Sequence, residues 1–131
     1  MLKNFSKHYL NEDQITLLNK IGYAEIDPEP IAPHWKNATI FINDVERTTI
    51  VAVVPAHILL EAIANHVTVN IIMFEADQAA RRVGKFATKR VKEFKIINGI
   101  IEEIREAEID APTVAVDFRT GEEVPYEVIQ Q

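Results

Sequence analysis

The chain has 131 residues, a length typical of one domain, with 47% hydrophobic and 26% charged residues. It contains no cysteine, which excludes disulfides, thiolate nucleophiles and cysteine-ligated zinc, and its net charge of −6 argues against general nucleic-acid binding. Its apolar runs are too short to span a bilayer, and its first residues do not begin a signal peptide. We therefore expect a cytoplasmic protein that binds neither membranes nor duplex nucleic acid.

The first part of the chain predicts two strands and a helix between them. Residues 2–6 can pair as a first strand. Asn11 and Gln14 have the spacing of a capping box at the start of a helix, which Gly22 ends. Residues 23–27 alternate enough to form a second strand. Three prolines then impose an extended loop: Pro28, Pro30 and Pro33.

The middle of the chain predicts the centre of the sheet. Residues 48–54 are uncharged and mostly β-branched, as in a strand buried on both faces. Pro55 breaks this strand and is placed to open a helix over 58–66, because the first turn needs no backbone N–H. Residues 35–45 favour a helix, although 39–42 could be strand. Residues 69–74 repeat the pattern of a buried strand.

The last part predicts a helix and a hairpin. Residues 75–83 indicate a loop or short helix, and 86–92 indicate an exposed edge strand. Apolar residues recur at helical spacing over 96–109, which predicts the last helix. Residues 113–118 and 124–129 are typical of a β-hairpin.

These elements together predict an α/β, Rossmann-like three-layer fold, with a mainly parallel sheet of four or five strands and helices on both faces. We divide the chain into a ligand-binding domain, residues 1–109, and a C-terminal hairpin extension, residues 110–131. A hairpin added to a compact domain commonly joins subunits, so we expect a homodimer or larger homo-oligomer.

In such a sheet, ligands bind beyond the carboxyl ends of the strands. Two polar segments should meet there: Ser6, Lys7 and His8 after the first strand, and Pro55, Ala56 and His57 after the central one. His57, in the first turn of a helix, could act as a base or hydrogen-bond a phosphate. The alternative is that both segments are ordinary polar loops. Metal-ligand and Gly-rich phosphate-binding motifs are absent from the sequence, so we expect no metal and no other cofactor.

Charge is distributed unevenly along the chain. Basic residues predominate between residues 75 and 95, and acidic residues predominate from Glu102 onward. One interpretation is a solvated basic face followed by an acidic tail. The other is a small basic patch for a phosphorylated ligand, with Arg81 and Arg82 as phosphate partners.

The N-terminal pattern Asn4-Phe5-Ser6-x-His8-x-Leu10-x-x-x-Gln14 resembles the opening of small accessory proteins of type III CRISPR systems, a Rossmann-like group linked to cyclic oligoadenylate turnover. Val54-Pro55-Ala56 is similar to their mid-chain strand end, and Ile104-Arg105-Glu106-Ala107 to their late arginine-containing segment. The resemblance covers residues 2–107. The chain departs from it at residues 65–68, where a Gly-rich turn would be expected.

The resemblance implies a cyclic oligoadenylate ligand, cyclic tetra-adenylate in particular, and a role in switching off this antiviral signal. It implies metal-independent ring cleavage, as in a ring nuclease, with catalytic residues Ser6, Lys7 and His8. The ligand-binding residues would be Asn4, Phe5, Pro55, Ala56, His57, Arg81, Arg82 and Arg105. Two alternatives stay open: a sequestering protein that holds the same messenger intact, and a structural adaptor that uses the C-terminal hairpin.

Overall fold

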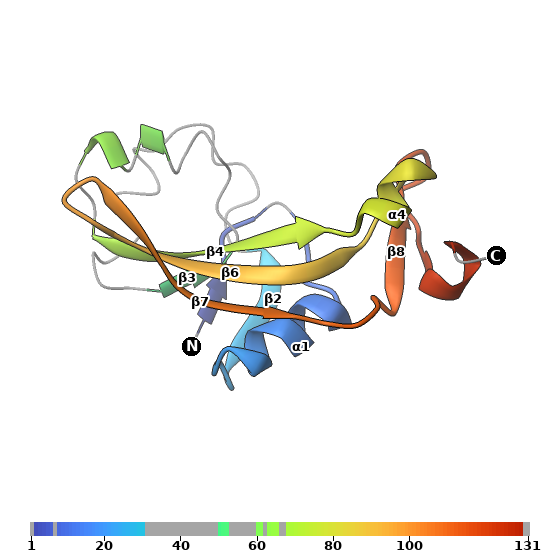
Figure 1. Cartoon of the computed structure of the whole chain (residues 1–131), viewed down its shortest axis with the longest axis horizontal. Coiled ribbons are helices and arrows are strands. Elements are labelled where there is room, and N and C mark those ends of the chain that lie inside the picture. Colours follow the sequence, from blue (N-terminus) through green and yellow to red (C-terminus); the bar gives the residue numbers. More distant parts are fainter. Residues whose placement is uncertain are drawn as a thin grey trace.

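The computed structural model describes residues 2–6, 8–30, 50–52, 60–61, 63–65 and 68–129. One sheet has six strands in the order β2-β1-β3-β4-β6-β7, and a smaller sheet has three in the order β5-β8-β9 (Figure 1). The strands of the larger sheet are β1 (Leu2–Asn4), β2 (Ile26–Pro30), β3 (Ile50–Ala52), β4 (Val69–Ala76), β6 (Thr88–Ile97) and β7 (Ile100–Glu108). Those of the smaller sheet are β5 (Lys85–Phe86), β8 (Val114–Asp117) and β9 (Glu123–Pro125).

The predicted Rossmann-like, mainly parallel sheet is wrong. The longest strand pairs, β4–β6 and β6–β7, are antiparallel, as are both pairs of the smaller sheet. Parallel pairing is confined to two or three registered residues in each of the pairs β1–β2, β1–β3 and β3–β4. The described part of the chain is therefore a mainly antiparallel β structure with two small helices, α1 (Glu12–Lys20) and α4 (Gln78–Arg82), followed by a 3-10 turn, η1 (Tyr126–Ile129).

The predicted last helix, residues 96–109, is also wrong, because this segment forms the end of β6, a turn and β7. Asn98 and Gly99 both have positive φ, 52° and 76°, and Ile97 lies opposite Ile100. This is the geometry of a two-residue type I′ turn, for which Asn-Gly is the preferred sequence. The helical spacing of the isoleucines is coincidental, and their β-branched side chains favour strands. The predicted strand over 86–92 is largely confirmed by β6, but it is not an edge strand, because β6 pairs with β4 and β7.

Replacing Gly99 by alanine is expected to destabilise the protein by about 1–2 kcal/mol, because an L-residue with a Cβ is strained at positive φ. Gly99→Asn is the matched control and should cost clearly less, since asparagine tolerates the left-handed region. Urea denaturation of both variants measures the difference. Equal losses in the two variants would contradict the turn described here.

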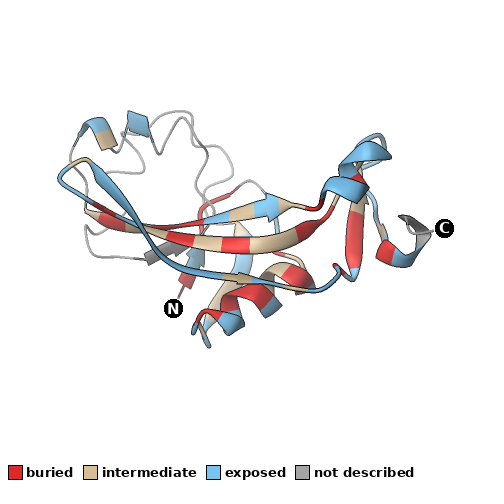
Figure 2. Cartoon of the chain, viewed as in Figure 1, coloured by how far each residue is buried: buried red, intermediate tan, exposed pale blue. Residues whose placement is uncertain are grey.

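Helix α1 confirms the capping signals read from the sequence. Asn11 Oδ1 accepts a hydrogen bond from Gln14 N, and Gln14 Oε1 accepts one from Asn11 N, both at 2.9 Å. After the helix, Gly22 adopts a φ of 110°. Leu17 and Leu18 are fully buried and pack into a core cluster with residues of the larger sheet (Figure 2). Helix α1 is thus anchored to this sheet.

Several other predicted elements are confirmed. They are β1 within residues 2–6, β4 at residues 69–74, the short helix α4 within 75–83 and the hairpin β8–β9 within 113–129. The second strand is shifted, since β2 overlaps the predicted 23–27 only at its start. Residues 50–52 form β3 within the predicted strand 48–54, and residues 60, 61, 63 and 64 are helical within 58–66. The predicted helix 35–45 lies outside the described residues. Across the described ranges, no helix is long and apolar enough to cross a membrane.

Candidate functional site

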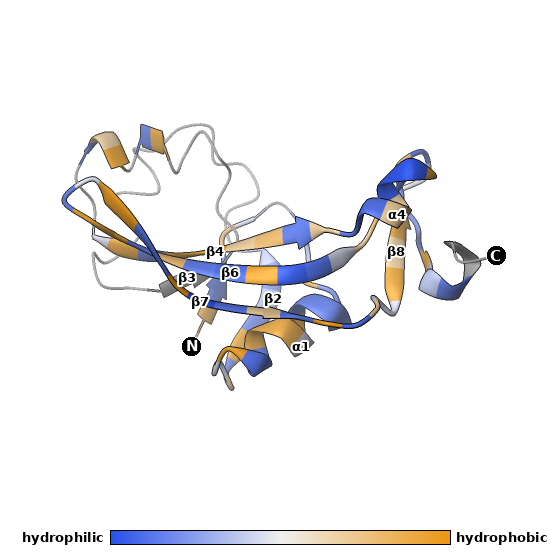
Figure 3. Cartoon of the chain, viewed as in Figure 1, coloured by the Kyte–Doolittle hydropathy of each residue, from blue (hydrophilic) through white to orange (hydrophobic). Residues whose placement is uncertain are grey.

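A pocket of about 680 Å³ lies where the two sheets meet. One wall comes from the loop after β1, the start of α1 and the strand β4. The other comes from β5, β8 and the turn that follows β8; Figure 3 shows β8 as largely hydrophobic. The lining residues are Ser6, His8, Tyr9, Leu10, Asn11, Gln14, Ile72, Met73, Phe74, Phe86, Val116, Asp117, Phe118 and Gly121.

Three large side chains that are exposed to solvent line this pocket. Tyr9 is 67% exposed, Phe118 is 62% exposed and Met73 is 45% exposed, and all three line it. Phe74 and Phe86, both half-buried, add two more aromatic rings to the lining. Apolar and aromatic walls with few polar groups are typical of sites that bind small organic molecules, and this volume lies in the usual range for them.

Asn4 and Ser6 hold the loop that forms one wall. Asn4 is fully buried, and its Nδ2 donates to His8 O at 2.8 Å and to Pro28 O at 2.9 Å. Asn4 Oδ1 accepts from Ser6 N at 2.9 Å, and Ser6 Oγ lies 2.7 Å from Asn4 Oδ1 and 2.8 Å from His8 O. These contacts engage the Ser6 hydroxyl in the loop and fix the backbone that presents His8 and Tyr9 to the pocket.

The structure brings only some of the predicted site residues together. Ser6 and His8 line the pocket, whereas Phe5 is buried and Arg81 and Arg82 are exposed on α4. Lys7, Pro55, Ala56 and His57 lie outside the described residues. Sequence reasoning missed the aromatic lining, Tyr9, Phe74, Phe86 and Phe118. A usable signal was present at Tyr9, because it places an aromatic ring in a predicted loop, where no core position requires it.

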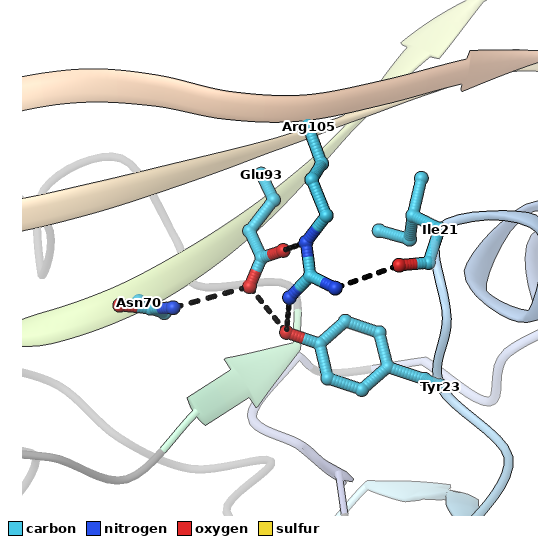
Figure 4. A network of polar contacts seen from close by, with 5 residues as sticks. All are labelled: Ile21, Tyr23, Asn70, Glu93 and Arg105. Carbon is cyan, nitrogen blue, oxygen red and sulfur yellow. Dashed lines mark hydrogen bonds and ion pairs between the residues drawn. The ribbon is translucent and has the colours of Figure 1, made fainter.

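Arg105, predicted as a phosphate partner, belongs to a separate polar network centred on the fully buried Glu93 (Figure 4). Arg105 Nε donates to Glu93 Oε1 at 2.6 Å, and Arg105 Nη1 donates to Ile21 O at 2.8 Å. Tyr23 Oη and Asn70 Nδ2 both donate to Glu93 Oε2. Ile21 caps the C-terminal end of α1, while the pocket is lined by residues from its N-terminal end. The guanidinium therefore neutralises a buried carboxylate away from the pocket.

Tyr23 is kept protonated by the same network. Burial, and then the hydrogen bond to Glu93, raise the pKa of Tyr23 above its ordinary value of 10.0. The pKa of Tyr23 is therefore higher in the folded chain than in the unfolded chain. The stability that comes from keeping the phenol protonated is fully present below about pH 10 and is lost as the pH rises through the folded-state pKa. Arg105 Nη2 donates to Tyr23 Oη at 3.1 Å, so the phenol both accepts and donates within the network.

Two buried aspartates tie the smaller sheet to the rest of the described structure. The Asp13 carboxylate, on α1, accepts from Thr113 N at 2.9 and 3.0 Å, from Thr113 Oγ1 at 2.8 Å and from Val114 N at 3.2 Å. Asp77, the N-cap of α4, accepts from Tyr126 Oη at 2.7 Å and from Ala80 N at 3.1 Å. Asp13 thereby joins the helix on one wall of the pocket to the strand on the other.

Part of the basic segment 75–95 is paired with acids across strands. Arg90 Nη2 lies 2.8 Å from Glu108 Oε2, and Lys92 Nζ lies 3.1 Å from Glu75 Oε1. These pairs favour the interpretation of a solvated, charge-compensated sheet surface for Arg90 and Lys92.

Within the described ranges, no group of three or more His, Cys, Asp or Glu side chains is placed to hold a metal ion. The sequence matches no protein-family model, and neither a curated protein nor a solved structure is significantly similar to it.

Proposed function

We propose that the pocket between the two sheets binds the base of a small nucleotide-like ligand. The observation that carries this proposal is the gathering of Tyr9, Phe118 and Met73, all substantially exposed, around a cavity of about 680 Å³. Exposed aromatic faces offer a stacking surface to a planar base, and such stacking contributes roughly 1–3 kcal/mol per base. Without a ligand, these apolar surfaces stay in contact with water.

The ligand we propose is a cyclic oligoadenylate, in particular cyclic tetra-adenylate, which the N-terminal pattern suggests. Its adenines are planar and suit the aromatic walls, while its phosphates would stay at the mouth of the pocket. Two basic residues neighbour residues of the lining: Arg119 follows Phe118 in the chain, and Lys85 lies opposite Asp117 in the strand register. A homodimer, expected from the hairpin, stays a prediction.

We propose sequestration of the messenger in preference to ring cleavage because of the contacts of Ser6, one of the three predicted catalytic residues. The Ser6 hydroxyl, which was expected to take part in cleavage, is buried and lies within hydrogen-bonding distance of Asn4 Oδ1 and His8 O. Its contacts suit a role in loop structure. We therefore propose a binding protein that lowers the concentration of free messenger, and cleavage is the alternative outcome of the experiment below.

Replacing Phe118 by alanine is expected to weaken binding of cyclic tetra-adenylate by about 10-fold, because one stacking surface is lost. Tyr9→Ala should have a similar effect. Isothermal titration calorimetry measures both, and chromatography of the ligand after incubation in EDTA separates binding from cleavage. An intact ligand supports sequestration, and a linear product supports ring cleavage.

The control for these variants is Val83→Ala. Val83 is an exposed apolar residue just beyond α4 and does not line the pocket, so its loss should leave the dissociation constant unchanged. Unchanged binding in both aromatic variants would place the ligand elsewhere. Failure of cyclic tetra-adenylate, AMP and adenosine to bind the unaltered protein would overturn the proposed function.

A further inference from the structure

We propose that Asp117 makes the pocket selective for ligands that present an N–H group at the edge of their base, such as the 6-amino group of adenine. This inference rests on the proposed function and names the chemical feature that the pocket recognises. Asp117 is the only Asp, Glu, Lys or Arg among the described residues that line the pocket. Its carboxylate is an acceptor only, so it favours donors and repels phosphates.

The carboxylate is fixed in place by the turn that follows β8. Asp117 Oδ1 accepts from Arg119 N at 2.8 Å, while the Asp117 backbone bonds to Glu122 O at 2.9 Å and to Gly121 N at 2.8 Å. The N–H of Arg119, and then that of Thr120, lower the pKa of Asp117 below its usual value, so the group is ionised at neutral pH. Two oxygens offer about four acceptor positions, so these contacts leave acceptor capacity for a ligand.

Two other polar side chains of the lining, Gln14 and Ser6, are already engaged. Gln14 Oε1 accepts from Asn11 N, and Gln14 Nε2 donates to Thr88 Oγ1 at 3.2 Å. Ser6 is held by its contacts with the loop. A base whose edge carries an N–H group can therefore donate a charge-assisted hydrogen bond to the Asp117 carboxylate. A base whose edge lacks an N–H group forms no such bond with Asp117.

The experiment compares adenosine with purine riboside, which lacks the 6-amino group, by NMR titration of the full chain. We expect the unaltered protein to bind adenosine about 10-fold more tightly, the typical effect of one hydrogen bond to a charged group. Asp117→Asn keeps an oxygen for Arg119 N but removes the charge, and should reduce the preference to less than about 2-fold. Asp110→Asn, an exposed acid outside the lining, should keep the full preference.

The outcomes separate this inference from the proposed function. Equal affinity of the unaltered protein for the two nucleosides overturns the role of Asp117 while leaving base binding in place, and this comparison needs no variant to fold. A preference that persists in Asp117→Asn also overturns it. If neither nucleoside nor cyclic tetra-adenylate binds the unaltered protein, the proposed function fails and this inference fails with it.

Discussion

Replacing Arg105 by leucine is expected to lower the free energy of unfolding by about 3–5 kcal/mol, because it leaves the charge of Glu93 buried without its cationic partner. Glu93 is fully buried, and its Oε1 accepts from Arg105 Nε at 2.6 Å. The same substitution removes the donor to Ile21 O, which caps the C-terminal end of α1. Urea denaturation followed by circular dichroism measures the loss.

Two further variants show whether this loss comes from the unpaired charge. Glu93→Leu combined with Arg105→Leu should recover a large part of it, because no charge is left buried. Arg81→Leu, at an exposed position on α4, should change stability by less than about 0.5 kcal/mol. A loss below about 1 kcal/mol for Arg105→Leu alone would contradict the network.

If Arg105 met a ligand phosphate, Arg105→Lys would weaken binding of cyclic tetra-adenylate, whereas we expect no change.

Replacing Asp13 by alanine is expected to cost about 3 kcal/mol of stability, because the N–H groups of Thr113 and Val114 lose their acceptor. Asp13 is only 3% exposed, and water can replace it poorly. Because Asp13 joins α1 to β8, the variant should also loosen the pocket and weaken ligand binding. Hydrogen exchange at residues 113–117 is expected to accelerate more than exchange in β4.

Glu12→Ala is the matched control for Asp13→Ala. Glu12 is the neighbouring acid in the same first turn, but it is exposed, and its Oε1 lies 2.7 Å from Thr113 Oγ1. A solvated contact of this kind contributes little, so the cost should stay below about 1 kcal/mol. Equal losses for Asp13→Ala and Glu12→Ala would mean that general helix electrostatics, and not the contact with β8, stabilise this region.

The sequence by itself determined the elements whose signals are local. Asn11, Gln14 and Gly22 lie within a few turns of the helix that they begin and end, so its position could be predicted from short-range hydrogen bonding alone. The uncharged run 69–74 and the turn between β8 and β9 are local signals of the same kind. The Asn98-Gly99 turn was equally local, but the isoleucine spacing over 96–109 matched a helix by coincidence.

Only the tertiary structure decided the direction of strand pairing, the role of Arg105 and the location of the pocket. Strand direction depends on how distant segments pack, and the antiparallel β4–β6–β7 arrangement overrode the expected parallel one. Glu93 forms hydrogen bonds with Arg105 and Tyr23, which are distant from it in the sequence. Its burial could therefore not be predicted from the residues next to it in the chain. Tyr9 and Phe118 line one pocket because the Asp13 contacts join α1 to the smaller sheet. Such contacts depend on the closure of long loops, for which short-range sequence patterns carry no information.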